Sequence, residues 1–425
     1  MIKLVYLLLG PSYFSDRWRS LFITGLLWAV VGVLLFIDGL DNALYFPIQA
    51  FAVLVAIDGL ATVAVAFTGI AGQRQLRLVK GAAALLTASL LFMAGAAHGG
   101  EFVLSMAFGL LFLADGVLQC GSAWLVRHKR WRGVMAGGVL QILIAVFFFQ
   151  PYPSHYQGTV PYALGLFLLI GGCKLMILAR HARAQGVDAL HPDRHAAVGN
   201  RRREFDGPPT ADEPALTVHV WTPGGSARSP TLNRPVVDRY IVAVDASGAI
   251  STGHAALQTP EGIYISLYPG VEIDRSPDEF TRVLRATDEN DGPGVFQPDY
   301  DTESKAWCPS TVQVRIRSYD AARLADFWAD YRQNPTYNLT RRNCSSSVSA
   351  ALEAALHGVV GANGGRGWGA LVRLLLTPEL WVAGQLRKRA LTMAWTPGLT
   401  LDYARALSML ADPRRLNWRR LWTRP

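Results

Sequence analysis

Hydrophobic positions in the first 180 residues gather in long runs, whereas later positions alternate over short stretches. A helix needs about 20 apolar residues to cross the hydrocarbon core of a bilayer. No small-residue cleavage site follows the first run and further runs come next, which excludes a cleaved signal peptide. The pattern predicts a multi-pass membrane protein with transmembrane helices at 21–37, 44–68, 82–97, 102–126, 133–150 and 160–179.

Basic residues alternate between the connectors and predict the orientation of these helices. Lys and Arg lie before the first run, between the second and third, between the fourth and fifth, and after the sixth. The other connectors carry acidic residues or no Lys or Arg. Connectors rich in Lys and Arg stay in the cytoplasm. Both termini, and everything after residue 180, are therefore predicted to be cytoplasmic.

An internal repeat is visible within the apolar runs. FAVLVAIDGL at 51–60 aligns with FGLLFLADGV at 108–117 and, more weakly, with LGLFLLIGGC at 164–173. The predicted unit is a transmembrane helical hairpin used three times. Asp58 and Asp115 occupy the same place in two units. They suggest either a proton or ion relay, or side chains that lie near an interface or are neutral and hydrogen-bonded to a neighbouring helix. A relay would be incomplete, because the third unit has Gly171 there.

Three tandem two-helix units, many glycines, the Asp-Gly step and a Pro after the first helix (Pro47, Pro151) resemble the HdeD family over residues 15–180. HdeD proteins are six-helix bacterial inner-membrane proteins associated with acid and stress resistance. The resemblance implies an inner-membrane location and a stress context rather than a reaction.

Short alternating segments after residue 215 predict strands at 216–221, 240–245, 253–259, 262–269 and 311–318. Helical patterns interrupt them at 276–284, 318–332 and 343–356. The predicted fold is therefore multidomain. An all-α six-helix transmembrane domain (1–180) is followed by a linker (181–215), an α+β domain (216–365) and a helical basic tail (366–425).

Composition and charge narrow the function. A chain with 51% hydrophobic and 17% charged residues is not disordered. The net charge is +9 for residues 1–203 (17 Lys and Arg, 8 Asp and Glu), −8 for 204–365 (13 and 21) and +8 for 366–425 (11 and 3). Separate segments of opposite charge do not indicate nucleic-acid binding. Four Cys without a CxxC pair predict neither a disulfide framework nor zinc, and no ligand cluster or phosphate loop predicts a metal or organic cofactor.

Cys344 and His254 carry the candidate chemistry. Cys344 opens an amphipathic helix, whose N-terminal N–H groups stabilise a thiolate and an oxyanion. His254 lies on a predicted strand and, beside a thiolate, serves as base and then acid. The alternatives are a structural cysteine and a surface histidine. Cys308 is a weaker rival nucleophile, because Pro309 disfavours helical geometry there.

The GHAAL…YISLYP hairpin and the later Tyr-x-Leu-x-x-x-Asn-Cys-Ser segment resemble the circularly permuted branch of the NlpC-type papain-like fold over residues 216–360. The resemblance implies a thioester intermediate in a peptidase, amidase or lipid acyltransferase. It places the third polar residue at Ser266, 12 positions after His254, although Ser orients an imidazole weakly; Gln258 is the alternative. The N–H groups near Asn343–Ser345 are expected to bind the oxyanion, and Tyr337 of the matched segment to lie on the substrate side.

The basic, Trp-rich tail is either an interfacial membrane helix or a cap on the acidic domain.

Three functions follow from these expectations. The first is a membrane-anchored cysteine peptidase or amidase in stress or protein quality control. The second is a thiol acyltransferase or lipase acting on membrane lipid, and the third is a non-enzymatic stress-resistance protein. Expected partners are the lipid bilayer and a protein or peptide substrate, with no nucleic acid; a homo-oligomer is left open.

Overall fold

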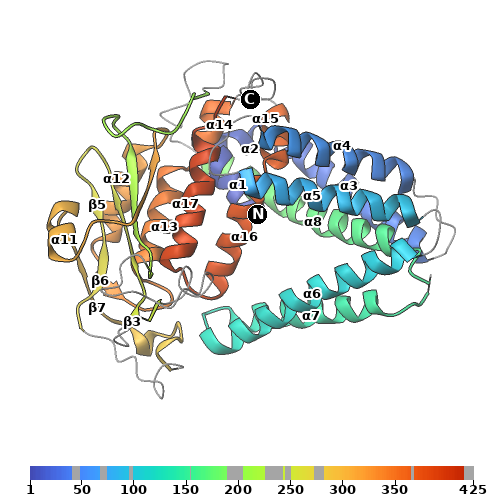
Figure 1. Cartoon of the computed structure of the whole chain (residues 1–425), viewed down its shortest axis with the longest axis horizontal. Coiled ribbons are helices and arrows are strands. Elements are labelled where there is room, and N and C mark those ends of the chain that lie inside the picture. The colour runs from blue at the N-terminus through green and yellow to red at the C-terminus, as the bar shows by residue number, and fades with distance from the viewer. Residues whose placement is uncertain are drawn as a thin grey trace, which may run out of the picture.

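Six long helices form the first part of the chain in the computed structural model, which describes residues 1–40, 48–67, 74–94, 99–153, 155–188, 204–224, 243–244, 250–271, 282–364 and 368–415 (Figure 1). All six are long and apolar enough to span a bilayer, which confirms the prediction of a multi-pass membrane protein. The compartment and the orientation of the termini stay predictions. The helices are α3 (Trp18–Leu40), α4 (Ile48–Ala66), α5 (Arg74–Ala94), α6 (Gly99–Val126), α7 (Trp131–Phe149) and α8 (Thr159–Asp188).

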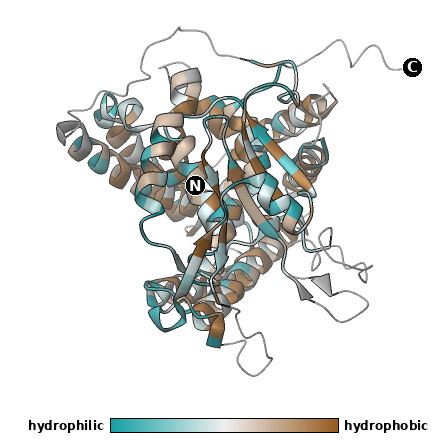
Figure 2. Ribbon diagram, turned by 90° about the vertical axis from the view of Figure 1, so that its left-hand side faces the viewer, coloured by the Kyte–Doolittle hydropathy of each residue, from teal (hydrophilic) through white to brown (hydrophobic). Residues whose placement is uncertain are grey.

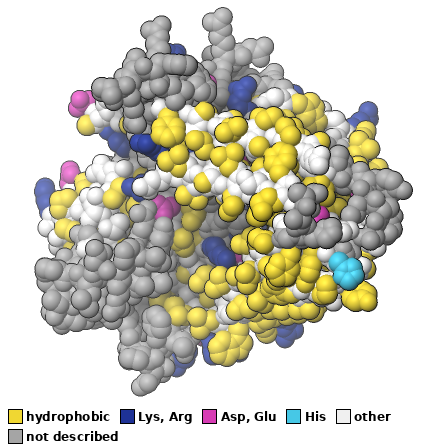
Figure 3. All heavy atoms as spheres, turned by 45° about the vertical axis from the view of Figure 1, so that its right-hand side comes forward, with side chains coloured by type: hydrophobic (Ala, Val, Ile, Leu, Met, Phe, Trp, Pro, Cys, Tyr) yellow, Lys and Arg dark blue, Asp and Glu magenta, His cyan; other side chains and the backbone are white. Residues whose placement is uncertain are grey.

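The outer faces of these helices are hydrophobic, as contact with lipid requires. Leu34, Leu54 and Leu111 are each at least 60% exposed. Figure 3 shows hydrophobic side chains covering much of this part of the surface. A water-soluble protein rarely exposes an apolar surface of this extent. The hydrocarbon core of a bilayer is therefore the solvent that suits these helices.

Small residues spaced seven apart bring the spanning helices together in close pairs. Gly25 and Gly32 of α3 lie against Gly172 and Gly165 of α8, and a Cβ added to Gly32 would lie 2.7 Å from the carbonyl oxygen of Gly165. A spacing of seven keeps the same narrow face of a helix toward its neighbour. Backbones can approach this closely in lipid only where side chains are absent or very small.

The close pairs are α3 with α8, α4 with α5 and α6 with α7. The predicted hairpin units combine α3 with α4, α5 with α6 and α7 with α8. The closest packing therefore joins one unit to the next, because the small-residue faces point between units. The repeat itself stays a prediction.

The second part of the chain is a mixed α/β region with small antiparallel sheets. The main sheet has the strand order β5-β4-β1-β8. Trp221 lies opposite His254 in the pairing of β1 with β4. The predicted strand at 262–269 is divided at Ser266, which forms a corner between two sheets. The strands are β1 (Leu216–Trp221), β2 (Ala243–Val244), β3 (Ile250–Ser251), β4 (His254–Gln258), β5 (Tyr264–Ile265), β6 (Leu267–Pro269), β7 (Gly292–Phe296), β8 (Val312–Ile316) and β9 (Thr336–Tyr337).

Helices pack on both sides of the main sheet. On one side, α13 (Cys344–Ala355) lies against β4, α12 (Ala321–Tyr331) and α17 (Pro397–Ala411). The short helices η1 (Asp288–Asn290) and α11 (Tyr300–Ala306) come from the segment between β6 and β8. Figure 2 looks onto this part, where hydrophobic and hydrophilic residues alternate along the elements. The alternation buries one face of each element, as in water-soluble proteins.

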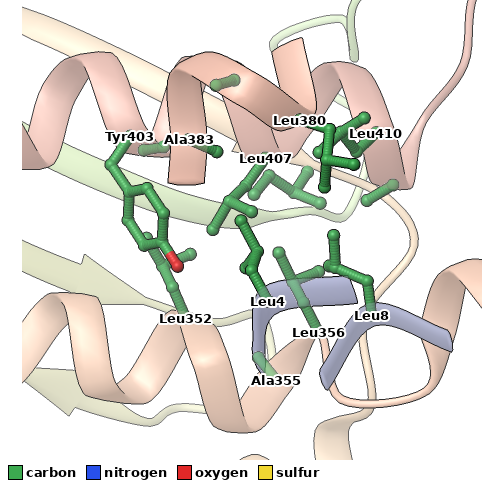
Figure 4. Packing of buried hydrophobic residues seen from close by; sticks show 14 of the residues in the cluster. Leu4, Leu8, Leu352, Ala355, Leu356, Leu380, Ala383, Tyr403, Leu407 and Leu410 are labelled. Carbon is green, nitrogen blue, oxygen red and sulfur yellow. The ribbon is translucent and has the colours of Figure 1, made fainter. Parts of the chain in front are cut away.

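The core of the α/β region includes the beginning of the chain. Leu4 and Leu8 of α1 (Ile2–Leu9) are fully buried among Leu352, Leu356 and Leu407 (Figure 4). We did not expect this helix from the sequence. The proposed domain boundaries stay predictions, but the observed core combines residues from both sides of them. The remaining helices are α2 (Pro11–Ser15), α14 (Val359–Gly364), α15 (Trp368–Leu376) and α16 (Pro378–Thr392).

The basic tail makes two kinds of surface. Tyr403 and Leu407 of α17 are fully buried against the α/β region. On α15, by contrast, Trp368, Val372 and Leu376 form an exposed apolar row at helical spacing. The tail thus packs on the α/β region through α17, and it presents an apolar face to its surroundings through α15. Residues 416–425, with Trp418 and Trp422, lie outside the described residues, as does the linker segment 189–203.

Candidate functional site

Cys344 is the first residue of α13, and a capping box holds it there. The Asn343 side chain accepts a hydrogen bond from the Ser346 N–H at 2.8 Å, and Ser346 Oγ accepts one from the Asn343 N–H at 2.8 Å. Asn343 Nδ2 donates to the carbonyl oxygens of Leu339 and Trp395. Polar residues at these positions are strong helix-start signals. The cap therefore fixes the place of the sulfur relative to the helix end.

His254 opens β4 and lies beside this sulfur. The His254 ring is close enough to the Cys344 sulfur to lower the pKa of the thiol. The other side of the ring is occupied, because Nε2 lies 2.8 Å from Ser266 Oγ and 3.2 Å from Glu303 Oε1. This leaves Nδ1 for the sulfur. Tyr268 stacks on the imidazole with ring centroids 4.2 Å apart, which holds the ring in this plane.

Glu303 is the residue that sequence reasoning missed. It lies on α11 and is only 3% exposed. Tyr264 donates to Glu303 Oε2 at 2.6 Å, and Tyr268 donates to Oε1 at 2.8 Å. These two hydrogen bonds hold the carboxylate in one orientation. Its only sequence signal is an acidic residue early in a short helix capped by Asp299, which marks a helix start and not a site.

The environment favours the thiolate form of Cys344. Burial raises the pKa of the thiol, but the nearby charge of His254, its hydrogen bond, Ser345 Oγ and the Ala255 N–H outweigh burial and hold the pKa below its ordinary value. The sulfur and the Ser345 oxygen lie 3.7 Å apart. A thiolate beside an imidazolium is the nucleophilic state of a cysteine.

Two backbone N–H groups lie next to the sulfur and have no acceptor in the part of the chain that the structure describes. They belong to Cys344 and Ser345, the first two residues of α13. The N–H of Asn343 is engaged with Ser346, so this group is not available to an oxyanion. The start of α13 can therefore offer two donors to a developing negative charge.

The alternatives for the third residue and the nucleophile lie in other surroundings. Gln258 Oε1 accepts a hydrogen bond from His219 Nε2 at 3.1 Å, so this side chain is bound to His219 and not to His254. Burial raises the pKa of the Cys308 thiol, which disfavours its thiolate. Ser266 does contact His254, as its spacing suggested. Tyr337, on β9, is buried and pairs with Gly292 of β7.

The two carboxylates of the spanning helices are both ion-paired. Asp58 lies 3.0 Å from Lys80 Nζ of α5. Asp115 lies 2.7 Å from Lys388 Nζ and 2.9 Å from Arg389 Nη2, which come from α16. Among the described residues the two carboxylates thus belong to separate ion pairs with neighbouring helices. The choice between a relay and a structural role stays a prediction.

Among the described residues, no group of three or more His, Cys, Asp or Glu has the arrangement of a metal site. The candidate site consists of Cys344, His254, Ser266 and Glu303. Comparison with known proteins gives no match to a family model, to a curated protein or to a solved structure.

Proposed function

We propose that this protein is a membrane-anchored thiol hydrolase that cleaves an amide or peptide bond. One observation supports this reading most directly. The His254 ring lowers the pKa of the Cys344 thiol at the start of α13, while Ser266 and Glu303 lie against Nε2 of the same ring. These are the nucleophile, base and orienting groups that acyl transfer through a cysteine needs.

In the proposed reaction, the Cys344 thiolate attacks the carbonyl carbon of the substrate. The N–H groups of Cys344 and Ser345 bind the oxyanion, and the protonated His254 transfers its proton to the leaving amine. A thioester between Cys344 and the acyl group results. His254 then accepts a proton from water as the water attacks the thioester, and the acid is released with the thiolate restored.

A papain-like arrangement and a role in stress or protein quality control belong to the same proposal. The packing of α13 across β4, with the histidine on the strand, supports the papain-like reading. The link to stress comes from the HdeD-like pattern of residues 15–180. A bacterial inner membrane with cytoplasmic termini is the location we propose.

A second candidate is acyl transfer to or from a membrane lipid by the same thiol. It is favoured by the attachment of the α/β region to the spanning helices, where the Ala286 N–H donates to the carbonyl oxygen of Val126 at the end of α6. The exposed apolar row of α15 adds a surface suited to lipid. A third candidate is a binding-only domain, in which the thiol carries out no reaction.

The test is performed on the full-length protein in detergent. A thiol-reactive probe is applied over a range of pH, and peptide mapping assigns the label among the four cysteines. Cys344 is expected to react below the ordinary pKa of a thiol, and His254→Ala is expected to move the onset of its reaction to higher pH. Cys308→Ala is the matched control, and it should leave the labelling of Cys344 unchanged.

Labelled casein and labelled phospholipid are then offered to the parent protein, Cys344→Ala and Cys308→Ala. Casein cleavage by the parent and Cys308→Ala, but not by Cys344→Ala, supports the hydrolase. Lipid turnover without proteolysis, lost in Cys344→Ala, replaces it with the acyltransferase. Turnover of neither substrate, with Cys344 no more reactive than Cys308, overturns both readings.

A further inference from the structure

Few large hydrophobic side chains are exposed in the α/β region. Among the residues described between 204 and 364, these are Val271, Val295 and Trp307. Single exposed hydrophobic residues are ordinary on a protein surface. Two of these three, however, belong to the segments that surround the candidate base, because Trp307 directly follows α11 and Val295 lies on β7.

Trp307 lies beside the imidazole of His254. The centroids of the two rings are 6.5 Å apart, and their planes are inclined by 69°. Trp307 also stacks on Trp221, a fully buried residue, with centroids 5.7 Å apart. Trp307 itself is 37% exposed. One part of this indole therefore packs against the core, while another part remains open to a group that approaches His254.

Two backbone contacts hold Trp307 in this place. Its N–H donates a hydrogen bond of 3.1 Å to the carbonyl oxygen of Glu303 at the end of α11. The carbonyl oxygen of the next residue, Cys308, accepts a hydrogen bond of 2.7 Å from the indole N–H of Trp221. A side chain that is already held in position loses little conformational entropy when it binds a further group. Trp307 is thus preorganised for such a contact.

A second exposed apolar side chain lies close to the same imidazole. Tyr268 stacks on His254, and Val295 is directly opposite Tyr268 in the pairing of β6 with β7. Residues that are directly opposite in an antiparallel pair project from the same face of the sheet. Val295 is 49% exposed. The surroundings of His254 therefore include two exposed apolar side chains from separate elements.

The chemistry of the proposed reaction decides which part of a substrate meets these side chains. His254 transfers a proton to the leaving amine, so that amine must come within about 3 Å of the ring. The donors for the oxyanion belong to the start of α13 instead. A side chain carried by the leaving amine is therefore brought to the surroundings of His254, where Trp307 lies.

We propose that Trp307, together with Val295, binds a large apolar or aromatic side chain on the amine side of the bond that is cleaved. The proposal rests on the thiol hydrolase proposed above and names its substrate class, which is peptides with Phe, Trp, Leu or Met after the scissile bond. Contact with an aromatic ring stabilises such groups, whereas a charged side chain loses hydration there.

The place of these elements favours a peptide as the occupant. In Figure 1, α11, β6 and β7 lie on the side of the α/β region that faces away from the spanning helices. A peptide in water reaches this side directly, whereas the acyl chain of a membrane lipid would have to leave the bilayer.

The test offers a mixture of synthetic peptides with randomised sequences to the full-length protein in detergent, and mass spectrometry identifies the residue after each cut. The parent is expected to prefer large apolar residues over Ala at this position by about tenfold. Trp307→Ala should lose most of this preference. Trp307→Phe should retain it, because an aromatic ring remains. Trp381→Ala is the matched control and should keep the preference, because Trp381 is also 37% exposed but belongs to α16, which contacts the spanning helices.

A second measurement needs no cleavage. Cys344 is alkylated with iodoacetamide and with N-benzyl iodoacetamide, and the ratio of the two rates reports whether an aromatic group binds near the thiol. The benzyl reagent should be favoured about threefold in the parent, as expected for an aromatic contact, and less in Trp307→Ala. The rate with iodoacetamide itself should be the same in both proteins, which separates a loss of binding from a damaged site.

The outcomes distinguish this proposal from the hydrolase on which it rests. Cleavage that depends on Cys344 but shows no preference on the amine side, or the same preference in Trp307→Ala, rejects the role of Trp307 and leaves the hydrolase intact. An equal loss of preference in Trp381→Ala, or equal rate ratios in the parent and Trp307→Ala, rejects it as well. If no cleavage depends on Cys344, the hydrolase fails and the substrate class fails with it.

Discussion

Two histidines on neighbouring strands of the main sheet have similar surroundings and different chemistry. His254 stacks on Tyr268 and bonds Ser266, while His219 stacks on Tyr300, with centroids 4.0 Å apart, and bonds Ser310. Both imidazoles are buried on the same face of the sheet, and the ring of Trp221 lies near both.

The difference lies in the remaining partner of each ring. His254 has the carboxylate of Glu303 at Nε2 and lies beside the Cys344 thiol, whose pKa it lowers. His219 has the neutral amide of Gln258, and burial lowers its pKa to about 4. At His219, burial outweighs the opposing effects of Gln258 and of the Glu303 charge, so the neutral imidazole is favoured. The comparison teaches that the anionic partner, and not the histidine or its aromatic neighbour, separates a candidate base from a structural residue.

The largest expected effect comes from removing each histidine in turn. His254→Ala should lower kcat/KM of the proposed hydrolase about 10²- to 10⁴-fold, because general acid–base catalysis contributes that much. His219→Gln should leave kcat/KM close to the parent value. Steady-state kinetics of both variants on the same substrate provide the test. A similar decrease in kcat/KM in both variants would remove the distinction between the two histidines.

Acid should destabilise the folded protein through protonation of His219. Its folded-state pKa of about 4 lies below the ordinary 6.5, so the folded state resists protonation. The stability from neutral His219 is complete above pH 6.5, and about 3 kcal/mol of it is lost as the pH falls through 4. The free energy of unfolding of the parent and of His219→Gln is measured in detergent above pH 6.5 and near pH 4. The decrease between the two pH values should be smaller in the variant. An equal effect would contradict the prediction.

Replacing the carboxylate of Glu303 makes the surroundings of His254 more like those of His219. Glu303→Gln keeps the shape of the side chain but removes the charge beside His254. Hydrogen bonds to charged groups contribute about 1.5–3 kcal/mol, so kcat/KM should fall about 10- to 100-fold. The onset of Cys344 alkylation should also move to higher pH. A loss of activity with no change in this pH profile would indicate a purely structural role.

The serines should give the smallest effect. Ser266→Ala removes a neutral hydrogen bond worth about 1 kcal/mol, and so about fivefold in kcat/KM. Ser310→Ala is the equivalent change beside His219 and should leave kcat/KM unchanged. Equal kinetics for the parent and Ser266→Ala would show that Glu303 alone orients the ring.

The parts predicted from the sequence depend on local patterns. The lengths of the apolar runs were enough to predict the six spanning helices. The amphipathic pattern that begins at Cys344 was enough to place this residue at a helix start. Alternation placed His254 on a strand, and the papain-like resemblance pointed to Ser266, 12 positions further on. In each case the signal and the structure lie within about a dozen residues, where periodicity holds.

The parts that were missed depend on contacts between distant segments. Glu303 reaches His254 from a separate short helix, and no spacing rule connects them. Gln258 has the right position on the strand, but His219 on the neighbouring strand engages its side chain. The pairing of α3 with α8 depends on glycines whose partners are over 100 residues away. Such choices are decided by tertiary packing, which a single sequence does not display.

The burial of α1 has a consequence for biosynthesis. Leu4 and Leu8 precede all six hydrophobic segments in the chain, whereas Leu407, which packs in the same cluster, follows them. The α/β core therefore cannot close until the chain between these leucines, with all six hydrophobic segments, has been made. The meeting of two segments far apart in the chain is thus a precondition for a completed core beside the thiol.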